Sequence, residues 1–104
     1  MEVLKIPGVD INLQDKEGNA AIHWAAWRNS LDCMKILLKT ESLDVNLKNS
    51  AGNTAAMICL IENRSEMFKT MMELSSIDLN IKNGMNKTLE EIARYKQARM
   101  KMPH

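Results

Sequence analysis

The sequence has few of the residues that build disulfide frameworks, metal sites or membrane spans. It contains two cysteines and two histidines, and no apolar run approaches the roughly 18 residues of a membrane helix. The N-terminus lacks a basic region followed by an apolar run, so we expect neither membrane insertion nor a secretory signal. Cys33 and Cys59 lie in segments that read as helices, and we interpret them as small core residues. A reducing compartment, the cytoplasm or the nucleus, is therefore the expected location.

An excess of one charge is also missing. Fourteen Lys and Arg residues are balanced by 13 Asp and Glu residues, for a formal charge of +1. Such a balance creates no field that would gather nucleic acid or acidic lipid, and we expect neither as a partner. The local basic excess between Arg94 and Lys101 has only Tyr95 as a stacking ring. A solvated terminal helix is therefore favoured there over a nucleic-acid contact.

The composition is nevertheless that of a folded protein. Apolar residues make up 45% of the chain and charged residues 26%, and 104 residues allow one domain. Nine methionines stand beside only 4% aromatic residues. Because methionine fills core gaps loosely, we expect a soft core.

The pattern of reactive residues indicates no catalytic or metal site. His23 and His104 lie at no ligand spacing from a cysteine, and there is no paired-cysteine motif. The adjacent pair Glu90-Glu91 would point about 100° apart on a helix, which favours a solvated helix start over a shared substrate. Gly18 and Gly52 are single turn glycines rather than a phosphate-binding loop. We therefore expect a protein that is not an enzyme and that needs no cofactor or metal.

An internal repeat organises the chain. The string Val9-Asp10-Ile11-Asn12 recurs in similar form at residues 43–46 and 77–80, two steps of 34 residues. Gly18-Asn19 recurs as Gly52-Asn53 after the same interval. Independent markers that keep one phase establish a repeat of this length, which is typical of stacked helical units.

Each period contains a polar turn followed by two helical segments. Residues 46–52 are rich in Asn and suit a turn, and Thr54 can cap a helix over residues 55–62. The polar break at residues 63–65 precedes a second helix, Glu66–Leu74, whose apolar residues fall at helical spacing. The preceding period has the same order. The sequence therefore predicts an all-α solenoid of antiparallel helix pairs.

This pattern resembles the ankyrin repeat family. The resemblance is carried by Asp15 to Ala26 (DKEGNAAIHWAA), by Cys33 to Leu38 and by Leu43 to Asn46. These segments match the family's Asp, Gly, Thr-Pro-Leu-His and Ala-Ala stretch, its aliphatic second helix and its closing Asp-Val-Asn. The resemblance implies an ankyrin-type helix-turn-helix solenoid, in which the ring of His23 fixes the turn by hydrogen bonding.

The sequence departs from the family pattern at several positions. Ala21 and Ala55 replace the proline that pre-sets a helix start, and Met57 replaces the motif histidine. Glu90 stands where the pattern places a buried leucine. We expect a small local shift there that lets Leu89 fill the pocket.

The phase of the repeat divides the chain. Residues 1–12 read as the tail of a preceding repeat, 13–46 and 47–80 as full repeats, and 81–104 as a partial terminal repeat. In the last unit we expect a first helix from Thr88 to about Tyr95, with too few residues left for a full second one. Stacked repeats need about three units to be stable. Membership of a longer array and self-association both remain open as the source of that stability.

The resemblance also implies a function. In the family, turn tips and the inner face of the first helices form a concave surface that binds another protein. We therefore expect a non-catalytic interaction module of a larger scaffold or regulatory protein. Homotypic assembly through exposed repeat faces is the alternative. The matching positions are Lys16, Glu17, Asn19, Ser50, Asn53 and Met85 on the tips, and Trp27, Arg28, Ile61 and Glu62 on the first helices.

Two interpretations of Trp27 stay open. Trp and Arg are common interface anchors, and Trp27 adjoins Arg28, while Ile61 can extend an apolar stripe one repeat on. In the other interpretation, Trp27 packs on the next repeat, as we expect of Trp24.

Overall fold

The computed structural model describes residues 10–101, with side chains described as far as Lys96. Helices account for all of the regular secondary structure in this range. The predicted all-α helical repeat fold is thereby confirmed, while the predicted N-terminal tail lies mostly outside the described residues. The helices are α1 (Ala21–Arg28), α2 (Leu31–Leu38), α3 (Ala55–Ile61), α4 (Ser65–Leu74) and α5 (Leu89–Lys101).

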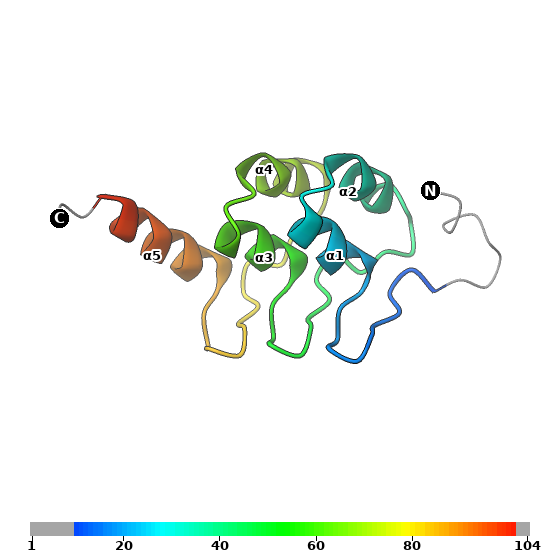
Figure 1. The fold of residues 1–104 in the computed structure, drawn as a ribbon, viewed down its shortest axis with the longest axis horizontal. Coiled ribbons are helices and arrows are strands. Elements are labelled where there is room, and N and C mark those ends of the chain that lie inside the picture. Colours follow the sequence, from blue (N-terminus) through cyan, green and yellow to red (C-terminus); the bar gives the residue numbers. More distant parts are fainter. Residues whose placement is uncertain (1–9, 102–104) are drawn as a thin grey trace.

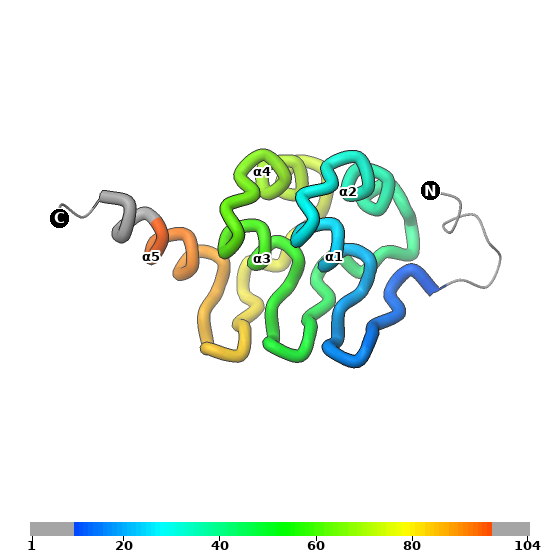
Figure 2. Tube along the Cα trace, viewed as in Figure 1, coloured from blue at the N-terminus to red at the C-terminus, as the bar shows by residue number. Residues whose placement is uncertain are grey.

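The helices form two rows (Figures 1 and 2). The first helices of the units, α1, α3 and α5, lie side by side, and the second helices, α2 and α4, form another row above them in the view of Figure 1. The long turns before α1, α3 and α5 project away from the second row. We call residues 15–19, 49–53 and 83–87 the first, second and third tip. The inner face is the side of the first helices that faces the tips.

Helix α1 starts without a capping hydroxyl, because Ala20 occupies the capping position. The ring of His23 instead binds the backbone of the capping residue: its Nδ1 accepts a hydrogen bond from the Ala20 amide at 2.9 Å. Its Nε2 therefore carries the proton and donates to the carbonyl of Leu47 at 2.9 Å, which links the first helix to the following turn. The structural role implied for His23 by the family resemblance is confirmed.

The other two first helices use hydroxyl caps. The hydroxyl of Thr54 accepts from the amide of Met57 at 3.3 Å, as the sequence predicts. Thr88 and Glu91 form a capping box: the Glu91 carboxylate accepts from the Thr88 amide at 3.1 Å, and the Thr88 hydroxyl accepts from the Glu91 amide at 3.3 Å. The bond from the Thr88 amide holds the pKa of the Glu91 carboxyl below its ordinary value. A buried histidine, a methionine and a carboxylate therefore occupy one repeat position.

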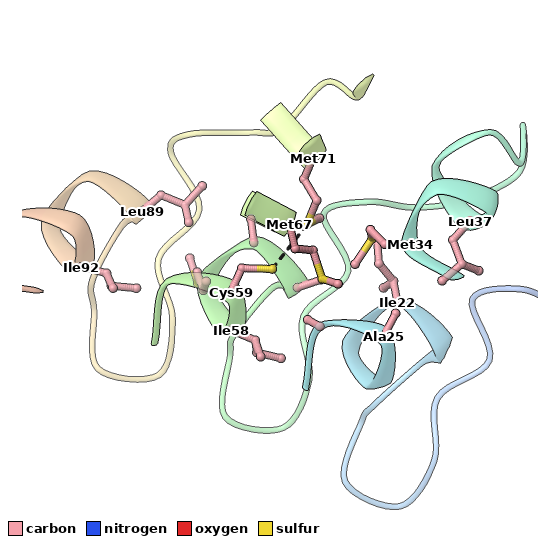
Figure 3. Close-up of a cluster of buried hydrophobic side chains, with 14 of the residues drawn as sticks. Ile22, Ala25, Met34, Leu37, Ile58, Cys59, Met67, Met71, Leu89 and Ile92 are labelled. Atoms are coloured by element: carbon pink, nitrogen blue, oxygen red, sulfur yellow. Dashed lines mark hydrogen bonds between the residues drawn. The ribbon is translucent and has the colours of Figure 1, made fainter. Parts of the chain in front are cut away.

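The core lies between the two rows (Figure 3). Leu89 is buried and Glu90 is exposed, as expected, but without the expected local shift, because α5 begins 34 residues after α3 and Thr88 caps it as Thr54 caps α3. Methionine contributes much of the volume, in agreement with the composition, and the Cys59 thiol lies 3.8 Å from the Met71 sulfur. The largest fully buried side chains are Ile22, His23, Met34, Leu37, Met57, Ile58, Cys59, Met67 and Met71.

Trp24, which the sequence predicts to pack on the next repeat, is exposed and contacts residues of its own unit. Its side chain is 40% exposed, and its indole Nε1 donates to the carboxylate of Asp15 at 3.2 Å. Ile58 and Ile92 occupy the same position in the next two units and are buried. The larger indole extends past this site onto the inner face, where the first tip holds it.

The last helix is longer than the sequence analysis predicts. The predicted helix ends near Tyr95, whereas α5 continues as one helix to Lys101. Helices α1 and α3 are followed by Asn29 and Asn63 with φ of 55° and 62°, a left-handed conformation that ends a helix. The same position in the last unit is Gln97, a good helix former, so no turn begins there.

Candidate partner-binding face

Each tip is closed by one side chain at its first residue. Asp15, Asn49 and Asn83 each accept hydrogen bonds from two amides, those of the residues two and four positions later. All six distances are 2.9 or 3.0 Å. These bonds satisfy backbone donors that a turn otherwise leaves to water. The shape of each tip is therefore encoded locally.

Asparagine pairs join one tip to the next. The side-chain amide of Asn49 donates to the side-chain oxygen of Asn19 at 3.0 Å, and Asn83 donates to Asn53 at 2.9 Å. Asn19 is only 5% exposed. Asn19, which the sequence predicts to contact a partner, therefore has a structural role, because this pairing leaves little of its side chain exposed. Lys87 occupies the same repeat position in the third tip.

The glycines of the tips allow this close stacking. Gly18 and Gly52 have φ of 77° and 80°, and a Cβ at either would lie 2.6 Å from the Ser50 nitrogen or 2.4 Å from the Gly84 nitrogen. Neither distance is tolerable for a side chain, so the next tip can approach only because glycine is present. The third tip has Asn86 at this position, with φ of 64°.

The inner face of the first helices carries an apolar row. Trp27, Ile61 and Tyr95 occupy one position in successive units, 34 residues apart. Trp27 is half-buried against the core, whereas Ile61 is 41% and Tyr95 63% exposed. Trp27 thus shares features of both interpretations left open by the sequence.

Two tryptophans and an arginine form a cluster at the α1 end of this row. The rings of Trp24 and Trp27 meet edge to face with centroids 5.4 Å apart. The guanidinium of Arg28 lies 5.9 Å from the centre of the Trp24 ring, within the range of a cation–π contact. The sequence predicted Trp24 to pack on the next repeat. The Asp15 carboxylate that accepts its hydrogen bond lies nine residues earlier, a spacing that carries no periodic signal.

At the other end, the row enters a groove of about 800 Å³ between the end of α3, the third tip and α5. Ile61 and Met85 line it, which brings together two of the predicted site residues. The remaining predicted positions are spread along the tips and first helices and do not line this groove. Those exposed to solvent are Lys16, Glu17, Arg28, Ser50 and Glu62, while Asn53 is half-buried.

Cationic side chains close the C-terminal ends of the first helices. The Arg64 guanidinium donates to the carbonyls of Ala26 and Trp27, at 3.4 and 2.7 Å. One unit later, the Lys96 ammonium donates to the carbonyl of Ile61 at 2.8 Å. Terminal carbonyls of a helix lack partners within the helix and carry partial negative charge, so these cations are well placed. Each connects one unit to its successor.

His23 and Cys59, two side chains that could be chemically reactive, are buried in the core. Burial lowers the pKa of His23, and burial raises the pKa of the Cys59 thiol to about 12. No cluster of three or more His, Cys, Asp or Glu residues that could hold a metal occurs within residues 10–101. His104 lies outside the described residues. No helix in this part of the chain is long and apolar enough to cross a membrane.

Comparison with known proteins agrees with this architecture. The family model for ankyrin repeats (3 copies) matches residues 1–83, and the whole of α5 follows the matched segment. The search of curated proteins gives no match. Ankyrin repeats generally serve as protein–protein interaction modules, and the family is typically non-catalytic. Because the match spans most of its length, the chain belongs to the ankyrin repeat family.

Proposed function

We propose that this chain is a non-catalytic module that binds another protein through its tips and its inner face. The main support is the exposure of apolar side chains along one row of that face. Ile61 and Tyr95 are 41% and 63% exposed, and Met85 on the neighbouring third tip is 78% exposed. Apolar side chains that share an exposed surface are typical of interaction sites.

The mechanism is a preformed platform. The tips are closed by their own side chains and joined by the Asn19–Asn49 and Asn53–Asn83 pairs. A partner that docks on them does not have to order these loops, so little conformational entropy is lost on binding. The first helices present the apolar row from the same rigid frame.

We also propose that the module belongs to a larger scaffold or regulatory protein in the cytoplasm or nucleus. The location rests on Cys33 and Cys59, which are both thiols, the second of them fully buried. Immunofluorescence of the tagged full-length protein tests it. A secreted product would contradict it.

The binding proposal is tested by affinity capture with a matched pair of variants. Ile61→Asp places a charge on the inner face, and Ile36→Asp places one on α2, where the isoleucine is 39% exposed. The two changes are equal in charge and nearly equal in initial exposure. We expect loss of the captured protein with Ile61→Asp only, with unchanged circular dichroism for both variants. Equal capture by both variants, or equal loss from both, would contradict the proposal.

Self-association is a second candidate function, supported by the exposed side of α4. Met72 and Leu74 are 39% and 51% exposed, and the described chain places no second helix after α4 in its row. If this surface forms a dimer, light scattering over a concentration series will show a rising mass that Met72→Lys suppresses. A constant monomer mass would rule this candidate out.

A further inference from the structure

The groove at the α5 end of the inner face has the form of a pocket for one large apolar side chain. Ile61, Met85, Ile92 and Tyr95 give it apolar walls, and its volume is about 800 Å³. Ligand pockets commonly enclose about 300–1,000 Å³. The space therefore accepts a bulky side chain together with part of the backbone that carries it.

The third tip makes this groove specific to one end of the molecule. Met85 forms its wall, whereas the residue in the same place on the second tip is Ala51, which offers only a methyl group. Met85 is 78% exposed, although its side chain is apolar. Methionine is also flexible, so it can adapt to the shape of an apolar partner. A side chain of this kind is most useful on a surface that becomes covered.

The charges around the groove are mainly positive. Among the described residues that line it are Lys87 and Lys96, and Glu91 is the only carboxylate among them. The Glu91 carboxylate is engaged by the amide and hydroxyl of Thr88 at the start of α5. The ammonium of Lys87 makes no ion pair or hydrogen bond within residues 10–96.

The second lysine keeps its capacity to bind an anion. Lys96 donates one hydrogen bond to the carbonyl of Ile61, which leaves two of its three donors and its full charge available. Nearby, Arg94 is paired with Glu90 at 2.8 Å, so these two charges offset each other. Lys87 and Lys96 therefore outweigh the single negative charge of Glu91, with which Lys87 interacts, and leave the described lining with a net positive charge.

We propose that the groove binds a protein segment in which a large apolar residue is flanked by acidic residues. The apolar side chain enters between Ile61 and Met85, and the flanking carboxylates lie against Lys87 and Lys96. This inference rests on the proposed function and adds the chemistry of the partner. Complementary charge at a rim mainly raises the association rate and selects among partners, while the buried apolar contact supplies the affinity.

The test is a selection from a phage library of random dodecapeptides on the full chain. The selected peptides are then titrated by fluorescence anisotropy. We expect enriched peptides to carry Asp or Glu beside Trp, Phe or Leu. Lys87→Glu should weaken binding roughly threefold to tenfold, mostly through the association rate. Lys69→Glu on α4 is the matched control, since it makes the same charge change at another exposed lysine and should leave affinity unchanged. Met85→Ala should weaken binding roughly tenfold.

The outcomes separate this inference from the proposed function. Selected peptides with basic flanks, or a library that gives no binders, would overturn the proposal that the groove binds an acidic segment. Affinity capture with Ile61→Asp would still decide whether the inner face binds protein. Peptides that respond to Trp24→Ala but not to Met85→Ala or Lys87→Glu overturn the groove and retain the inner face. A dimer in light scattering that Met85→Ala dissolves would assign the groove to a second copy and overturn the proposed occupant.

Discussion

Gly52→Ala is expected to break the contact between the second and third tips. A Cβ at this position would lie 2.4 Å from the Gly84 nitrogen, and the backbone φ is 80°. The left-handed conformation costs an L residue about 1–2 kcal/mol. The clash also separates the Gly84 amide from the Ala51 carbonyl, now 2.9 Å apart, and each lost hydrogen bond costs about 0.5–1.5 kcal/mol. With the Asn53–Asn83 pair also weakened, the loss totals about 2–4 kcal/mol.

Asn86→Ala provides the matched control. It also places alanine in a left-handed conformation, with φ of 64°, at the same position of the third tip. No later tip packs on it within the described residues, so only the conformational cost of about 1 kcal/mol remains. Urea unfolding followed by circular dichroism gives both free energies. Equal destabilisation by the two substitutions would show that stacking of the tips contributes nothing.

Three other changes are expected to have measurable effects. Arg64→Met keeps the aliphatic stem but removes the hydrogen bonds to the end of α1. Urea unfolding should show a free energy of unfolding lower by about 1–3 kcal/mol. An unchanged free energy would contradict the stabilising role of this cation. Because burial holds the pKa of His23 below 6.5, the unfolded chain binds the proton more readily. Stability should therefore be full above pH 6.5 and fall as pH drops below it towards the folded pKa, and this dependence should vanish in His23→Gln. Because burial raises the pKa of the Cys59 thiol to about 12, Cys59 should react with a thiol reagent only on unfolding. Cys33, which is only partly buried, should react in the native protein. Rapid labelling of both thiols would contradict the buried position of Cys59.

The parts of the fold that follow from the local preferences of single residues could be predicted from the sequence. The 34-residue phase located the helices, and a hydroxyl at Thr54 indicated where α3 begins. The misfit of Glu90 pointed to the burial of Leu89. Each inference depends on a local preference, for capping or for burial at helical spacing, which the sequence expresses directly.

The parts that depend on contacts between units were not predictable. Trp24 and Trp27 differ by one helical turn, and periodicity alone does not distinguish which indole the core admits. The hydrogen bonds of Arg64 reach back 37 and 38 residues to α1. The groove is formed by α3, the third tip and α5 together. The sequence therefore predicted Ile61 and Met85 as site residues but not that they lie in the same groove.

The third tip gives the stack a direction. A glycine on one tip makes room for the backbone of the next, and an asparagine oxygen receives its side-chain amide. The third tip has Asn86 and Lys87 in those places, so it can dock on a predecessor but cannot receive a successor in the same way. New units engineered between residues 46 and 47 should therefore join the column. A unit attached after α5 would first require Asn86→Gly and Lys87→Asn.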